Sequence, residues 1–138
     1  MRLDTMNDDR VLIDTSIWID YFQNKSCTFS VAVDDILSSE NVYIPKVVIA
    51  ELIQGARSQK EVSVIENYFD AFNIIDQQED TWIEAGKLSY RLKKKGKNIN
   101  LTDCYIATIA ITYKCKVFTL DKHFKEIQRE TDLNLYLV

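Results

Sequence analysis

Four acidic residues stand where short apolar runs end or within expected helices, and their types and spacing could do chemistry. Asp14 ends the run VLID, and Asp121 follows the run KVFTL. Asp103 stands at the start of an expected helix, and Glu51 lies between one and two turns into another. Four converging carboxylates cannot all be ionised without compensation, because like charges at short range raise each other's pKa. The pattern therefore predicts a pocket that binds a cation.

The residue types indicate which cation this pocket would take. Carboxylate oxygens are hard ligands, and without a cluster of histidines or cysteines they suit Mg²⁺ or Mn²⁺. His123 is the only histidine in the chain, so a site that needs two histidine ligands is excluded. Mg²⁺ keeps several waters and usually takes few carboxylates together with phosphate oxygens. The pocket is therefore a candidate for phosphoryl chemistry, in which the metal activates a water and stabilises charge on the scissile phosphate.

Short apolar runs alternate with amphipathic stretches, and these must form the elements that position the acids. We expect strands at residues 11–14, 42–44, 72–75, 116–120 and 133–137. We expect helices at residues 16–22, 29–38, 46–55, 61–72, 81–95, 101–113 and 123–128. Strands that alternate with helices favour an α/β fold, in which helices cover both faces of a mostly parallel sheet. In such sheets ligands bind at the carboxyl ends of the strands.

The length and composition are typical of one globular domain. The chain has 138 residues, of which 46% are hydrophobic and 28% charged, so we expect a single domain spanning residues 1–138. No apolar run approaches the roughly 20 residues that cross a bilayer, and the polar, acidic start does not resemble a secretory signal. The odd number of cysteines, Cys27, Cys104 and Cys115, favours reduced thiols. We therefore expect a cytoplasmic protein with no membrane association.

The acidic net charge does not exclude a nucleic acid as partner. The net charge is −4, so the chain is neutral once the four candidate acids are set aside. A basic stretch precedes Asp103 and could hold a phosphate backbone electrostatically. Its ordinary interpretation is a solvated helix end whose charges suit the helix dipole. The stretch consists of Arg91, Lys93, Lys94, Lys95 and Lys97.

Four segments together resemble the PIN-domain nucleases, and within them the VapC toxins of bacterial and archaeal toxin–antitoxin systems. VLIDTSIWIDYF (11–22) is similar to the family's opening strand with its acid and DTS turn. IPKVVIAELIQG (44–55) is similar to the segment that carries the second acid. GKNINLTDCYIATIAI (96–111) is similar to the third acid with its helix, and VFTLDKHF (117–124) to the closing TxDxxF segment. Each block alone is weak, but four in family order are specific to the fold.

The resemblance implies a PIN-like three-layer sandwich and a Mg²⁺- or Mn²⁺-dependent endoribonuclease that hydrolyses RNA. Matched by motif, Asp14, Glu51, Asp103 and Asp121 would be the acidic quartet that is both catalytic and metal-binding. It further implies a cognate antitoxin protein that silences the toxin, and a homodimer. The resemblance also implies small polar neighbours that orient ligands or water, namely Thr15, Ser16 and Thr119.

Each acid also has a purely structural alternative. Asp14, Asp103 and Asp121 could each cap a helix, because Asp is a common N-cap residue. Glu51 lies in an apolar run, where an unpaired acid is costly to bury, and could instead face solvent beside the core. We favour the site for all four, because the four blocks occur together.

Other residues favour ordinary structural roles. Asp20 lies within the first expected helix, where a solvated face or a salt bridge is the expected role. For His123 we favour a surface or capping role over general acid–base catalysis. Trp18, Tyr21 and Phe22 are expected in the core, and an interface with an antitoxin helix is the alternative.

Competing functions fit the same residues less well. A phospho-acceptor receiver domain needs a pair of acids at the first strand's end, but Ile13 and Thr15 flank a lone Asp14. A phosphatase with a DxD turn needs a second Asp at the position of Ser16. A PIN fold that serves as a non-catalytic RNA- or protein-binding module remains the alternative, although the intact quartet argues against it.

Overall fold

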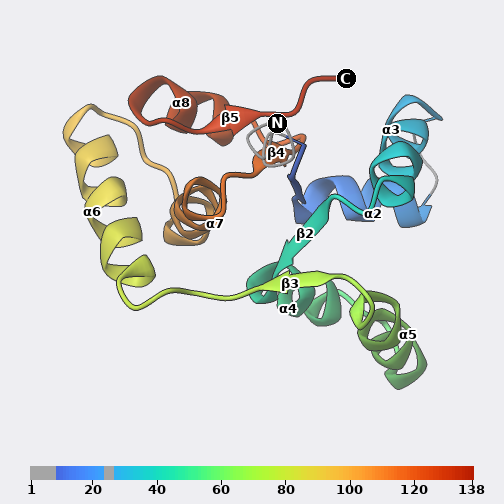
Figure 1. Ribbon diagram of the computed structural model, residues 1–138. Coiled ribbons are helices and arrows are strands. Elements are labelled where there is room, and N and C mark those ends of the chain that lie inside the picture. The colour runs from blue at the N-terminus through green and yellow to red at the C-terminus, as the bar shows by residue number, and fades with distance from the viewer. Residues whose placement is uncertain (1–8, 24–26) are drawn as a thin grey trace.

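Five short strands form one sheet in the computed structural model, which describes residues 9–23 and 27–138 (Figure 1). The order across the sheet is β3-β2-β1-β4-β5, and each pair of neighbours is parallel. The strand that comes first in the described chain therefore lies at the centre of the sheet. The strands are β1 (Val11–Ile13), β2 (Val42–Pro45), β3 (Asn73–Ile75), β4 (Lys116–Phe118) and β5 (Asn134–Leu135).

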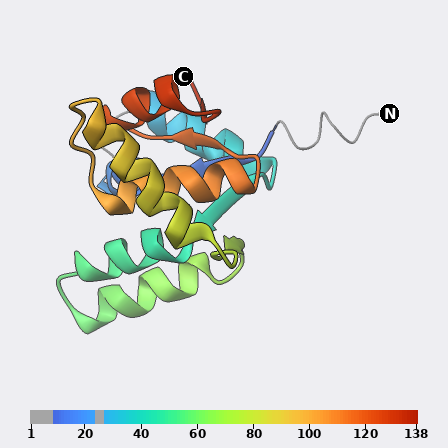
Figure 2. The ribbon, with the colours of Figure 1, turned by 90° about the vertical axis from the view of Figure 1, so that its left-hand side faces the viewer.

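Helices cover both faces of the sheet, as expected of a three-layer sandwich. The helices are α2 (Thr15–Gln23), α3 (Cys27–Ser38), α4 (Lys46–Gln54), α5 (Gln59–Phe69), α6 (Thr81–Lys94), α7 (Leu101–Thr112) and α8 (His123–Glu130). Figure 1 shows α6 and α7 on one side of the sheet and α2 and α3 on the other. Helices α4 and α5 lie side by side as a hairpin in Figure 2. The predicted α/β fold with a parallel sheet is confirmed.

The central strands are buried on both faces, which explains why their sequences are continuous apolar runs rather than alternating ones. Leu12 and Ile13 are fully buried, and so is Val117 of the neighbouring strand. The register pairs Ile13 with Phe118, so β1 and β4 end level with each other. The residues that follow the two strands consequently emerge at the same edge of the sheet.

The predicted elements are present, and the differences lie at their ends. Pro45, which lies between the expected strand at 42–44 and the expected helix at 46–55, is the last residue of β2 and the N-cap residue of α4. Helix α5 ends at Phe69 rather than residue 72, because the chain turns before β3 begins at Asn73. In the part of the chain that the structure describes, no helix has the length and apolar character needed to span a bilayer.

Candidate active site

The candidate site begins where β1 and β4 end. Asp14 follows β1 directly, and its backbone N–H donates a hydrogen bond of 2.9 Å to the carbonyl of Phe118 in β4. This bond joins the two strand ends beyond the regular ladder. Thr119 and Asp121 follow β4 and therefore lie beside Asp14, although about a hundred residues separate them in sequence.

Asp14 is buried and is held by two hydroxyl groups. The whole residue is only 6% exposed to solvent. The hydroxyls of Ser16 and Thr119 donate to its Oδ2 atom, at 3.0 and 2.8 Å. Burial raises the pKa of Asp14, the hydrogen bonds from Thr119 and Ser16 oppose that rise, and the nearby charge of Asp121 adds to it. Two of the predicted supporting residues thus stabilise the ionised form of this acid.

Asp103 enters the same site from the first turn of α7. The side chain of Asn100 caps this helix, because its Oδ1 accepts a hydrogen bond of 2.8 Å from the backbone N–H of Asp103. The carboxylate of Asp103 is therefore not used as the cap. Burial raises the pKa of Asp103 to about 6, and the charges of Asp121 and Asp14 contribute to the rise. Three of the predicted acids are thus close enough to affect one another's ionisation.

His123 lies against two of these acids. The sequence favoured a surface or capping role, and its side chain is 41% exposed, but its Nδ1 is 3.2 Å from Oδ2 of Asp103 and 3.6 Å from Oδ1 of Asp121. Its backbone N–H also donates to Oδ1 of Asp121, at 2.9 Å. The hydrogen bond to Asp103 is the main reason that the pKa of His123 is raised. The sequence feature that could have indicated this contact is the position of His123, two residues after Asp121 and at the start of a short helix.

Glu51 is joined to the site through a threonine. The hydroxyl of Thr15 donates a hydrogen bond of 2.7 Å to Oε1 of Glu51, and Thr15 is the neighbour of Asp14 in the chain. One ligand atom each from Asp103, Asp121 and His123 lie within 4.8 Å of one another, and neither Asp14 nor Glu51 is part of this group. The structure therefore brings two acids and the histidine together, and the Thr119 hydroxyl joins Asp14 to Asp121 beside them.

The donor set suits a divalent cation. The site combines carboxylate oxygens with one imidazole nitrogen, and both are common metal ligands. Burial is the main cause of the raised pKa values of Asp14 and Asp103, and the neighbouring carboxylates add to the rise. A cation placed among them would lower those pKa values, since an opposite charge favours the ionised form. Asp14, Asp103 and Asp121 are the residues that would hold it, with His123 beside them.

The basic stretch lies at the end of α6 and in the loop that follows, and part of it is engaged. Lys95 and Lys97 form ion pairs with Glu130 at the end of α8. These two lysines therefore join α8 to the loop between α6 and α7. The remaining residues of the stretch are exposed: Arg91, Lys93 and Lys94.

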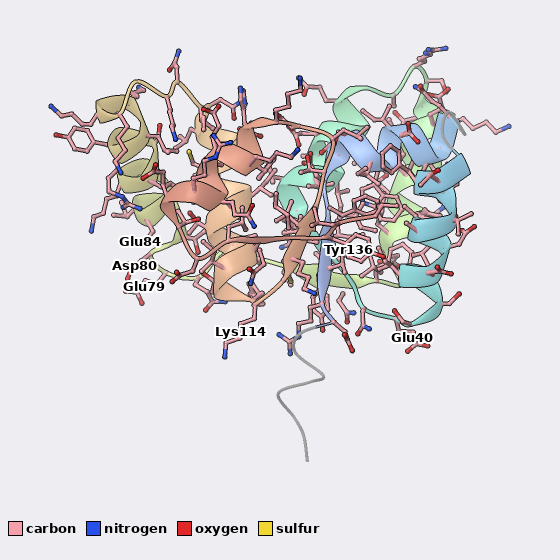
Figure 3. All side chains as sticks on the ribbon, turned by 90° about the horizontal axis from the view of Figure 1, so that it is seen from above. Glu40, Glu79, Asp80, Glu84, Lys114 and Tyr136 are labelled. Atoms are coloured by element: carbon pink, nitrogen blue, oxygen red, sulfur yellow. The ribbon has the colours of Figure 1, made fainter. Side chains whose placement is uncertain are left out.

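One expectation outside the site is wrong. Asp20 was expected on a solvated face or in a salt bridge, but it is only 9% exposed. Its Oδ1 has no hydrogen-bond partner among the residues that the structure describes. The reason is that α2 packs against both α3 and α4, so this side of the helix faces other helices. By contrast, the exposed acids Glu79, Asp80 and Glu84 point outward near the start of α6 (Figure 3).

A second concave region lies away from the acids, between α2, α4 and α5. It is a groove of about 710 Å³ whose lining includes Ile19, Phe22 and Val64. These three side chains are 42%, 45% and 58% exposed, so the groove presents apolar surface to solvent. Trp18, in contrast, is fully buried and packs edge to face on Phe69, with ring centroids 4.9 Å apart. The expected core role holds for Trp18, whereas Phe22 belongs to the groove.

Comparison with known proteins places these features in context. The model of the family described as PIN domain matches residues 11–130. Ribonuclease VapC1 of Methanocaldococcus jannaschii is 30% identical over 129 residues, covering 94% of this chain and 88% of the relative. Ribonuclease VapC1 of Haemophilus influenzae (strain R2866) is 29% identical over 126 residues, covering 88% of this chain and 92% of the relative.

A solved structure has the same fold. The 2.2 Å structure of VapBC-1 from nontypeable Haemophilus influenzae contains a chain that superposes with a TM-score of 0.73 and 27% identity. The match covers 91% of this chain and 96% of that chain. The similarity therefore extends over most of the length of both chains.

Proposed function

This chain belongs to the PIN-domain family, and on that premise we propose that it is a metal-dependent endoribonuclease that acts as the toxin of a toxin–antitoxin pair. The observation that carries the proposal is that Asp103 of α7 lies beside Asp121, which follows β4, and that Thr119 joins Asp14, at the end of β1, to Asp121. Burial, and in part the neighbouring carboxylates, raise the pKa values of Asp14 and Asp103, so a cation bound there would favour their ionised forms. Relatives over most of the chain's length bear the name ribonuclease.

The roles of the side chains follow from their contacts. When bound, Mg²⁺ or Mn²⁺ would supply a Lewis acid for the scissile phosphate and lower the pKa of a bound water. Asp14, Asp103 and Asp121 would hold it through their carboxylates. Thr119 and Ser16 favour the ionised form of Asp14 and fix the direction of its carboxylate by donating to the same oxygen. Thr15 fixes the direction of Glu51, the fourth acid.

We infer that the exposed end of α6 contributes to RNA binding. Arg91, Lys93 and Lys94 carry charges that no acid of the described residues neutralises by an ion pair, whereas Lys95 and Lys97 are paired with Glu130. Basic side chains attract the phosphate backbone irrespective of sequence. These basic side chains would therefore contribute to the affinity for RNA but not to the selection of a particular RNA sequence.

The partner proposed for the apolar groove is a helix of the cognate antitoxin. The groove between α2, α4 and α5 offers half-exposed apolar side chains along its wall, and amphipathic helices bind in such grooves through apolar residues at helical spacing. The solved structure named above is of VapBC-1, and another solved neighbour is described as a member of the VapBC family of toxin–antitoxin systems, which supports an antitoxin as the partner. We further propose that the chain forms a homodimer.

The direct test is cleavage of RNA by the purified chain, with and without metal. We expect cleavage with Mg²⁺ or Mn²⁺, no cleavage in excess EDTA, and recovery when the metal is restored. Asp14→Asn and Asp103→Asn should each abolish cleavage while leaving the fold intact. Asp35→Asn, the same change at an exposed position of α3, is the matched control and should cleave normally.

Each outcome separates the alternatives. Unchanged cleavage by Asp14→Asn or Asp103→Asn would contradict the assigned site, and full activity in excess chelator would contradict the metal. Absence of cleavage by the unchanged chain on every RNA offered would favour the non-catalytic binding module. Expression of the chain in cells, with Asp14→Asn as the comparison, tests the toxin role through growth arrest.

A further inference from the structure

The ring of His123 points into the acid cluster rather than away from it. Its Nδ1 atom is 3.2 Å from Oδ2 of Asp103 and 3.6 Å from Oδ1 of Asp121. The distance to Asp121 is longer than an ordinary hydrogen bond. A hydrogen bond therefore explains why Nδ1 lies close to Asp103 but not why it lies close to Asp121. Both acids nevertheless converge on the same nitrogen, which lies within 4.8 Å of an oxygen from each.

These separations resemble those between neighbouring ligands of one cation. Donors at right angles around an octahedral ion, with bonds of about 2.1 Å, are about 3 Å apart. The distances from Nδ1 to the two carboxylate oxygens lie slightly above this value. The separations are therefore compatible with all three side chains binding one ion.

The backbone of His123 is fixed by its surroundings. Its N–H donates to Oδ1 of Asp121, which holds the first residue of α8 against the turn after β4. The next residue, Phe124, is fully buried, and so is Ile127 one turn later. α8 thus starts at a defined place relative to Asp121. From this position the imidazole ring of His123 can either lie beside the acids or point into solvent.

We propose that Nδ1 of His123 is a nitrogen ligand of the active-site cation, beside the carboxylates of Asp103 and Asp121, and that it biases the site toward Mn²⁺ over Mg²⁺. The inference rests on the proposed function, because it concerns the cation of that same site. Imidazole suits transition metals, and Mg²⁺ prefers oxygen donors. Neutral imidazole binds metals through either ring nitrogen, so Nδ1 is an acceptable donor.

A spectroscopic test can detect this bond directly. The chain contains one histidine, so ring-¹⁵N histidine labels a single side chain, provided that the protein is made without a histidine tag. Pulsed electron paramagnetic resonance of bound Mn²⁺ should show coupling to a directly bound ¹⁴N nucleus, replaced by ¹⁵N coupling in the labelled protein. The coupling should disappear in His123→Asn, which can still bond to Asp103 but has no imidazole nitrogen.

The affinities provide a second, independent measurement. We expect His123→Asn to weaken Mn²⁺ binding by at least about tenfold and Mg²⁺ binding, measured by competition with Mn²⁺, by less than about threefold. Gln128→Ala, an uncharged change at an exposed position of the same helix, should alter neither. An equal loss for both metals would indicate that His123 only positions Asp103, and would overturn the proposal.

The outcomes also separate this inference from the proposed function. Mn²⁺ that binds without nitrogen coupling would overturn the role of His123 and leave a metal-dependent ribonuclease with an all-oxygen site. Absence of Mn²⁺ and Mg²⁺ binding would overturn both the histidine ligand and the metal requirement. RNA cleavage in chelator would then decide whether the ribonuclease assignment survives without the metal.

Discussion

The Asp103 carboxylate weakens the fold that holds it. Burial, together with the charges of Asp121 and Asp14, raises its pKa from 3.8 to about 6. In the absence of a cation, the folded protein therefore binds a proton more tightly at this position than the unfolded chain does. Between about pH 4 and pH 6 the free energy of unfolding falls as the pH rises, and the loss is complete at neutral pH. The full rise in pKa corresponds to roughly 3 kcal/mol at most.

Replacing this acid should consequently stabilise the protein. We expect Asp103→Asn to raise the free energy of unfolding at pH 7 by about 1–3 kcal/mol in metal-free buffer, and to flatten its dependence on pH between about pH 4 and pH 6. Urea unfolding across that pH range, with EDTA present, measures both effects. Asp35→Asn is the control and should reproduce the original profile. An unchanged profile for Asp103→Asn would show that the carboxylate is already compensated.

The Thr119 hydroxyl supports two parts of the site at once. It donates to Asp14 and accepts a hydrogen bond of 2.9 Å from the backbone N–H of Asp121. We expect Thr119→Val to reduce RNA cleavage about 10–100-fold and to raise the metal concentration needed for half-maximal activity, since groups that orient metal ligands have effects of this size. Thr119→Ser keeps the hydroxyl and should stay close to the unchanged chain. Equal activity of the two variants would contradict the role of the hydroxyl.

The sequence indicates the acids of the site more readily than the contacts between them. Asp14 and Asp121 could be predicted because each follows an apolar run, and parallel strands end at a common edge. The contact between Thr15 and Glu51 could not be predicted, because it depends on how α4 is placed relative to α2. The contact of His123 with Asp103 and Asp121 likewise could not be predicted, because it depends on where α8 begins. Whether these side chains act as catalytic or metal-binding groups remains a prediction.

Helix α7 is the element that delivers Asp103. It is apolar on all sides and buried, so its position is set by packing against α6, α8 and β4. Its first turn carries the one acid of the helix, and the side chain of Asn100 satisfies the backbone N–H of that residue. The cap therefore leaves the carboxylate free to face Asp121 and His123.

The Asn100 cap has a measurable contribution. We expect Asn100→Ala to lower the free energy of unfolding by about 1 kcal/mol, since a backbone N–H at the start of α7 loses its acceptor. Asn100→Ser can accept the same bond and should retain most of the stability. Denaturant unfolding of the three proteins side by side gives the comparison. A loss in the Ser variant as large as that in the Ala variant would argue against the capping bond.

Helices and strands could be predicted here because apolar runs and helical spacing are local properties of the sequence. Their ends depend on tertiary contacts and were less predictable. Pro45 belongs to β2 because it lies in register with Ile75 of β3, a tertiary contact that the local sequence does not reveal. Asp20 is buried because two helices pack against α2, and the polarity of the residue gave no indication of this.

At the scale of the whole molecule, the acid cluster and the apolar groove are separate surfaces. The acids emerge at the ends of β1 and β4, whereas the groove lies between α2, α4 and α5. α2 is common to both, because Thr15 and Ser16 at its start contact the acids while Ile19 and Phe22 line the groove. A partner seated in the groove therefore contacts the helix that holds Asp14 in place.

A charge placed in the groove should weaken binding of the partner without affecting the fold. We expect Val64→Glu to reduce the affinity for the cognate antitoxin by at least about tenfold, because docking would bury the new carboxylate without a counter-charge. Val31→Glu, a similar change at an exposed position of α3 outside the groove, should leave the affinity unchanged. Titration calorimetry measures the affinities, and thermal unfolding checks both variants. An affinity of Val64→Glu equal to that of the unchanged chain would show that the antitoxin binds another surface.

The hydrogen bond between Thr119 and Asp14 joins residues 105 positions apart in the sequence. β1 is an early strand, yet its neighbour β4 follows only after six helices and two further strands have been made. Contacts of such long range form late in folding, because closing the loop must precede any gain from the contact. A ribosome partway through this chain therefore holds no assembled active site. A nuclease built in this way becomes competent only after β4 and Thr119 have been made.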